Sequence, residues 1–180
     1  MTIAEKKKKE NIAEYLLFLW QMEDLVRAAN FDLSVIRTFL SNEIDADALD
    51  NEMNWFGTLI RAMQSSGVQQ KGHVEEVNEI LIELNYLHHT LLNILHHDQF
   101  AKVWNAAELN LRDFLEMSGN KTMNPVEACL TALYGLMMLR LKKQEVSDET
   151  MKAMDTFRNY ISMLSEQYRI MRSGDLFSIN

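Results

Sequence analysis

The chain has 180 residues, a formal charge of -8, six glycines, one proline and one cysteine. With 47% hydrophobic and 24% charged residues it has the composition of a folded globular protein, which excludes a disordered, fibrous or disulfide-rich chain. Because Cys129 is alone, cysteine-based zinc and iron–sulfur sites lack their ligands.

The choice of apolar residues predicts an all-α fold. Leucine and methionine total 36 residues, whereas valine and isoleucine total 19. Unbranched and γ-branched side chains lose little rotamer freedom in a helix, whereas β-branched ones favour strands. We therefore expect a single helical bundle of six or seven helices, mostly antiparallel and up-and-down, in one domain over residues 1–180 with frayed ends at 1–4 and 173–180.

Apolar spacing and cap residues predict the helices in chain order. Asp32 and Asp98 are the expected caps of the second and fifth helices, and Asn124 followed by Pro125 and Glu127 is the clearest helix start. The sequence leaves open whether the fourth and fifth helices are one kinked helix or two. The expected helices cover about residues 4–29, 33–40, 49–65, 73–97, 99–117, 125–143 and 147–171.

The first helix carries a distinctive run, Asn11-Ile-Ala-Glu-Tyr-Leu-Leu-Phe-Leu-Trp-Gln-Met-Glu-Asp-Leu-Val-Arg-Ala28, which follows four lysines. It resembles the opening of an uncharacterised all-helical family of Bacteroidetes proteins, most strongly over residues 5–32 and weakly along the whole chain. The resemblance implies an all-α fold and a cytoplasmic bacterial protein. It implies no activity and no site.

A group of polar side chains in this helix is a candidate binding site. Glu23 and Asp24 precede Arg27 by four and three residues, a spacing typical of a helical ion pair. The alternative is a polar cleft for a ligand amine or a partner cation, formed by Trp20, Gln21, Glu23, Asp24 and Arg27.

All five histidines lie in the 30 residues between Lys71 and Lys102, a stretch without lysine or arginine. His88, His89, His96 and His97 are the candidate metal ligands. Their spacing is wrong for a single ion on one helix, because two such ligands should be three or four residues apart. We therefore predict no metal or other cofactor, and we expect acidification to change stability or oligomeric state through these histidines.

Two later helices carry apolar surfaces suited to self-association. Residues 128–139 contain no charged side chain, and the last helix has a heptad-like stripe typical of a bundle or dimer seam. A central helix of the bundle and a contact between subunits both remain open as interpretations. The residues proposed for a subunit contact are Ala128, Ala132, Gly135, Met151, Met154, Phe157, Ile161 and Leu164.

Sequence motifs do not indicate an enzyme. Glu-x-x-His pairs, His-Glu-x-x-His, phosphate-binding loops and Gly-x-Ser-x-Gly do not occur. Beyond Lys6 to Lys9 the chain has 14 basic and 26 acidic residues, so nucleic acid is not an expected partner. A signal peptide is not recognisable and the apolar runs are too short to span a bilayer, so we expect a cytoplasmic protein that does not bind membranes.

The function expected from the sequence is that of a non-enzymatic interaction or scaffold protein that forms a homodimer or binds another protein. The alternative is a small-ligand or metal-responsive binding protein that uses the histidine-rich helix 73–97.

Overall fold

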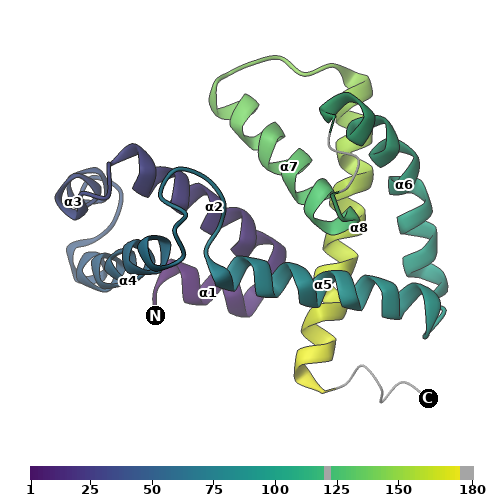
Figure 1. The fold of residues 1–180 in the computed structure, drawn as a ribbon, viewed down its shortest axis with the longest axis horizontal. Helices are drawn as coiled ribbons and strands as arrows, with labels where there is room; N and C mark the ends of the chain where they lie inside the picture. The colour runs from purple at the N-terminus through teal and green to yellow at the C-terminus, as the bar shows by residue number, and fades with distance from the viewer. Residues whose placement is uncertain (120–122, 175–180) are drawn as a thin grey trace. The chain divides into compact units, whose positions relative to one another are not determined.

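The computed structural model describes residues 1–119 and 123–174, and within these ranges its regular structure is helical, without strands (Figure 1). The predicted all-α fold is confirmed. The predicted count of six or seven helices is wrong, because the described residues form eight. These are α1 (Ile3–Glu10), α2 (Ile12–Ala28), α3 (Leu33–Leu40), α4 (Ala46–Ser65), α5 (Glu75–Asn93), α6 (Asp98–Ser118), α7 (Pro125–Leu141) and α8 (Asp148–Ser173).

The extra helix arises because the predicted first helix is interrupted at Asn11. This residue has an extended backbone, with φ -153° and ψ 113°. Its side-chain oxygen accepts hydrogen bonds from the amides of Ala13 and Glu14, at 3.0 and 3.1 Å, and so caps α2. The apolar spacing continues across the break, so periodicity alone does not reveal it.

The N-terminal residues begin a capped helix, whereas residues 1–4 were predicted to fray. Thr2 and Glu5 form a capping box at the start of α1. Ala4 is buried, and the amide of Ile3 donates to the buried carboxylate of Glu52 on α4, at 2.7 Å. Most of the other predicted frayed end, residues 175–180, lies outside the described residues.

The chain divides into two compact units, Met1–Ile80 and Leu81–Asn180, and α5 begins in the first and continues into the second. In the first unit α1 packs on α2, α3 packs on α4, and α2 contacts α4. In the second unit α6, α7 and α8 pack on one another. Large side chains fill both cores, including Leu16, Ile36, Phe56 and Met63 in the first unit and Phe100, Leu130, Phe157 and Tyr160 in the second.

The structure separates α5 from α6. The backbone of α5 ends at Asn93, and His96 adopts a left-handed conformation with φ 47°. The cap of α6 is His97, whose Nδ1 accepts from the amide of Phe100 at 3.2 Å, so the predicted cap Asp98 is instead the first residue of the helix. Leu95 lies beyond the end of α5 and is exposed.

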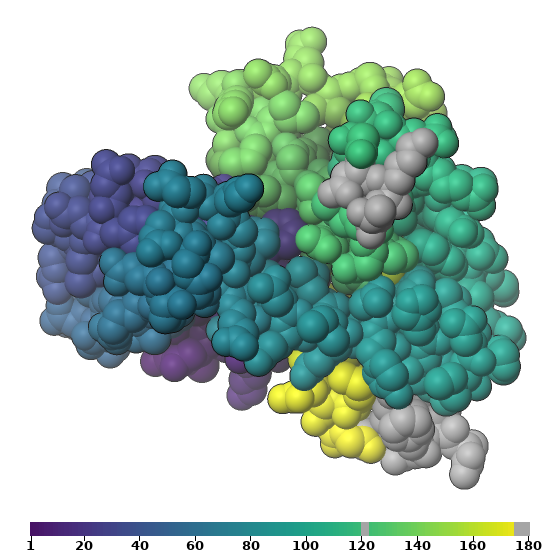
Figure 2. All heavy atoms as spheres, in the orientation of Figure 1, coloured from purple at the N-terminus to yellow at the C-terminus, as the bar shows by residue number. Residues whose placement is uncertain are grey.

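The two C-terminal helices begin as predicted. Asn124 caps α7 by accepting from the amide of Glu127 at 2.9 Å, and Ser147 caps α8 by accepting from the amide of Thr150 at 3.2 Å. Atoms of α7, coloured green, are visible on the surface of the second unit (Figure 2). Within the described part of the chain, none of the helices combines the length and apolar content that crossing a membrane requires.

The break at Asn11 leads to a stability prediction. Replacing Asn11 with alanine should lower the free energy of unfolding by about 1 kcal/mol, because the first amides of α2 lose their acceptor, whereas Asn11→Ser should retain most of it. Urea denaturation followed by circular dichroism measures the difference. Asn51→Ala, exposed within α4, is the control and should not be destabilising. Equal stability of Asn11→Ala and wild type would show that this cap is unimportant.

Candidate functional site

The first unit contains a completely buried carboxylate, that of Glu23 on α2. The Nδ1 of His73 donates to Glu23 Oε2 at 2.6 Å, and the amide of Val74 donates to Oε1 at 2.8 Å. The indole ring of Trp20 stacks on the His73 ring, with centroids 4.6 Å apart and planes 16° apart. We call the arrangement of Glu23, His73 and Val74 the Glu23 clamp.

Arg27, one helical turn further along α2, holds the same loop at other points. Its guanidinium donates to the carbonyl oxygens of Val68, at 3.1 Å, and of Gly72. It also pairs with Asp24 at 3.0 Å, which confirms an i,i+3 ion pair in this group. Glu23 and Arg27 therefore fix residues 68–74 against α2.

The predicted polar cleft is consequently not open where the sequence placed it. Glu23 and Arg27 do come together with Trp20 and Asp24, but the chain's own loop supplies the partners of Glu23 and Arg27. Gln21 is half-buried on the same helix. A buried carboxylate is costly without donors, so this group positions a loop and does not offer an unfilled site.

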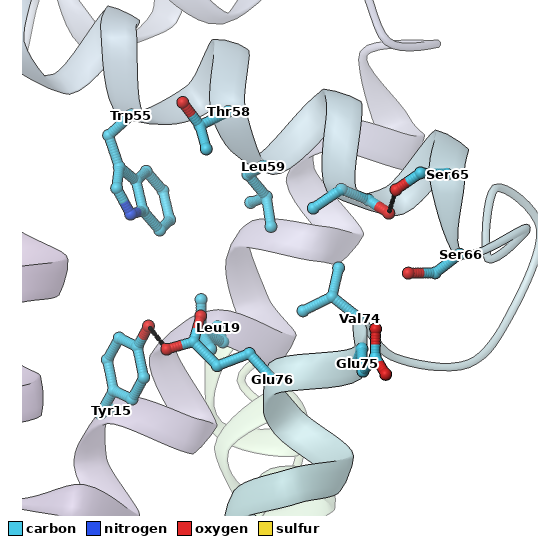
Figure 3. Close-up of a pocket in the computed structure, with 11 residues that line it drawn as sticks. Tyr15, Leu19, Trp55, Thr58, Leu59, Ser65, Ser66, Val74, Glu75 and Glu76 are labelled. Carbon is cyan, nitrogen blue, oxygen red and sulfur yellow. Dashed lines mark hydrogen bonds between the residues drawn. The ribbon is translucent and has the colours of Figure 1, made fainter.

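A pocket of about 190 Å³ lies beside the clamp, between α4 on one side and α2 and the start of α5 on the other (Figure 3). Val74 belongs both to the clamp and to the pocket wall. The pocket is lined by Tyr15, Leu19, Trp55, Thr58, Leu59, Ala62, Ser65, Ser66, Val74, Glu75 and Glu76.

The polar end of this pocket is built around Glu76. The Tyr15 hydroxyl donates to Glu76 Oε1 at 3.0 Å, and Lys8 Nζ lies 2.6 Å from the same oxygen. Lys8 Nζ also lies 5.6 Å from the centre of the Tyr15 ring. Burial, and then the nearby Glu76 carboxylate, raise the pKa of Tyr15 well above its ordinary value, so the hydroxyl keeps its proton.

Sequence reasoning did not find this pocket. Its lining comes from three segments, around residues 15–19, 55–66 and 74–76, and only the folded chain brings them together. Each segment carries an ordinary apolar stripe with polar neighbours, a pattern that predicts a core helix and gives no signal of a cavity.

The histidine-rich region contains one buried histidine. His88 is 3% exposed, and its Nδ1 lies 2.9 Å from the hydroxyl of Tyr160 on α8. Its ring contacts those of Phe100 and Trp104, at centroid distances of 5.8 and 4.7 Å. Burial, with a smaller effect from His89, lowers the pKa of His88 to about 4.

The four candidate ligand histidines do not meet at one point. His89 and His96 are exposed, and His97 is occupied as the cap of α6. Only the His88 and His89 rings are in contact, with centroids 5.1 Å apart. Among residues 1–119 and 123–174, no group of three or more His, Cys, Asp or Glu side chains could hold a metal ion.

Most of the residues predicted for a subunit contact lie in the core of the second unit. Gly135 is exposed and Met151 is half-buried, so these two retain accessible surface. The apolar stripe of α8 is covered by the packing of α6 and α7 and serves as an intramolecular seam. The buried members are Ala128, Ala132, Met154, Phe157, Ile161 and Leu164.

A family model described as a domain of unknown function, DUF4924, matches residues 1–175, so the chain belongs to this family. No curated protein and no solved structure matches the chain.

The Glu23 clamp predicts that replacing Glu23 lowers the free energy of unfolding much more than replacing its neighbour Asp24. Glu23→Ala should lower the free energy of unfolding by about 3 kcal/mol, because it leaves the His73 ring and the Val74 amide without their acceptor. Asp24→Ala removes an exposed partner of Arg27 and should cost less than about 1 kcal/mol. Chemical denaturation of both variants measures the contrast. Similar losses in the two would contradict the structural role of Glu23.

His88 predicts a dependence of stability on pH. Its folded-state pKa of about 4 lies below the ordinary value of 6.5, so between these values the unfolded chain binds the proton more readily. Stability should therefore fall by about 3 kcal/mol as the pH drops through this window. Replacing both hydrogen-bonded partners, in His88→Phe with Tyr160→Phe, should remove that contribution, whereas His89→Ala should retain it. Urea melts between pH 7 and 4 measure it, and an unchanged slope in the double variant would exclude His88 as the cause.

Proposed function

We propose that this member of the DUF4924 family is a non-enzymatic, cytoplasmic interaction protein that pairs with a second copy of itself through the outer face of α7. That face consists of Thr131, Tyr134, Gly135, Met138 and Leu141. Leu141 is 62% exposed, Gly135 is also exposed, and the other three are half-buried. The observation that carries the proposal is that residues 128–139 are uncharged although one side of their helix is accessible.

Physical chemistry favours covering such a face. A helix that is apolar on all sides is ordinarily buried on all sides. Two copies of a chain with a charge of -8 repel each other, and an uncharged surface is where they approach at the lowest electrostatic cost. This argument favours a second copy as the occupant.

The opposite charges at the two ends of α7 support a two-fold contact. Glu127 lies in the first turn of α7, and Lys142 is the residue directly after the helix. They are 15 residues apart, so helical geometry continued by one residue would place them about 60° apart around the axis. Tyr134 and Gly135 lie midway between them. In an antiparallel pair of α7 helices centred there, Glu127 of each copy faces Lys142 of the partner subunit. A side chain added at Gly135 would meet nothing within 4 Å, so this position also leaves room for the close approach of a helix.

The alternative function, a metal-responsive protein using the histidine-rich helix, has less support. His88 is enclosed by aromatic rings and His97 caps a helix, which leaves His89 and His96 as the exposed pair. We also propose that the protein comes from a member of the Bacteroidetes, as the resemblance of its N-terminal helix implies.

Self-association is tested by light scattering after size-exclusion chromatography, at several concentrations. The wild type should have about twice the monomer mass, and Met138→Glu should be monomeric because it places a charge in the contact. Leu109→Glu is the matched control, since Leu109 is 65% exposed on α6 of the same unit, and it should remain dimeric. A monomeric wild type, or a dimer unaffected by Met138→Glu, would contradict the proposal.

A charge exchange tests the antiparallel geometry separately. Lys142→Glu should weaken the dimer, and combining it with Glu127→Lys should restore it, since each pair regains opposite charges. Failure of the double variant to recover, with its fold intact by circular dichroism, would contradict the two-fold arrangement.

A further inference from the structure

The first unit already binds an ammonium group, that of its own Lys8. The Lys8 nitrogen is placed against the Glu76 carboxylate and near the face of the Tyr15 ring, the two kinds of group that recognise ammonium ions in proteins. Tyr15 is buried, and its hydroxyl fixes the carboxylate by donating to the same oxygen. The core therefore holds Tyr15 in place, and Tyr15 in turn orients the Glu76 carboxylate.

Glu76 and Tyr15 line the polar end of the pocket in Figure 3, whereas Lys8 is not one of the lining residues and reaches the Glu76 carboxylate from α1. We infer that this pocket is a binding site for a small primary amine with an apolar body, and that Lys8 Nζ occupies the ammonium position in the present structure. The inference concerns a different unit from α7 and does not depend on self-association.

The remaining lining fits the body of such a ligand. Leu19, Leu59 and Val74 supply apolar surface, and the Trp55 indole supplies an aromatic face. A cavity of about 150 Å³ is known to hold benzene, so a pocket of about 190 Å³ has room for one ring with a short arm. Glu75 adds a second carboxylate to the lining, which favours a cation over a neutral or anionic ligand.

Lys8 is a weak competitor for this position. The side chains of Lys8 and Glu76 are 52% and 41% exposed, and exposed ion pairs of this kind contribute little to stability. A ligand that also fills the apolar part of the pocket can displace Lys8 at a small cost in affinity. Removing the Lys8 charge should accordingly tighten binding by about two- to fivefold.

Benzylamine is a suitable probe, and benzyl alcohol is its neutral counterpart. When benzylamine is titrated into the full chain, the NMR signal of the Trp55 indole should shift until the site is saturated. The dissociation constant from this titration should be at least tenfold lower than that of benzyl alcohol. Lys8→Met keeps the apolar stem without the charge and should bind benzylamine two- to fivefold more tightly. Lys9→Met, on the exposed next residue of α1, is the matched control and should bind as wild type does.

Two further variants distinguish a failure of the amine site from a failure of the proposed self-association. Glu76→Gln should weaken benzylamine binding at least tenfold, with its fold checked by the thermal midpoint, and Met138→Glu should leave binding unchanged. Equal binding of the amine and the alcohol, an absence of saturable shifts, or identical affinities in Lys8→Met and Lys9→Met would overturn the inference.

Discussion

The carboxylate of Glu23 lies in the core of the first unit, where an unpaired charge would cost several kcal/mol. It remains there because His73 and the Val74 amide reach it from a part of the chain 50 residues away. If loop 68–74 left α2, the Glu23 carboxylate would lose the His73 and Val74 donors that compensate for its burial. Arg27 strengthens the same attachment through carbonyl oxygens at positions 68 and 72.

This attachment determines where α5 begins. Val74 is the residue before the first turn of α5, whose amides have no partners within the helix. By accepting from the Val74 amide, Glu23 acts as a cap supplied by another helix. Glu75 and Glu76 follow directly, so the clamp also places the two carboxylates that line the pocket. The polar group in α2 and the pocket are thus parts of one arrangement, in which the first positions the second.

Local interactions made most of the helices predictable. Asp32, Asn124 and Ser147 cap their helices with side chains acting on amides two or three residues away, so short sequence windows contain the whole interaction. Asn11 acts in the same way but was missed, because the apolar stripe continues through it. His97 was also missed, because a histidine cap is uncommon and Asp98 stands beside it.

The site depends on contacts that are distant in sequence. The spacing of Glu23 and Arg27 suggested a helical ion pair, but the partners of Glu23 are residues 73 and 74 and those of Arg27 include residues 68 and 72. Spacing cannot reveal such partners. The contact residues predicted on α7 and α8 show a similar limit of the sequence pattern. An apolar stripe has the same spacing whether it packs within one chain or between two chains. Only the fold showed that α8 is covered from within, whereas one face of α7 remains accessible.

The central claim, that Glu23 holds the start of α5, is tested most directly by hydrogen exchange of the Val74 amide in the native protein. With the carboxylate as its acceptor, this amide should exchange as slowly as core amides of α2, although it precedes the helix. Exchange as fast as that of the exposed loop residue Gln70 would show that the bond is not maintained, and would contradict the account of both the loop and the pocket wall.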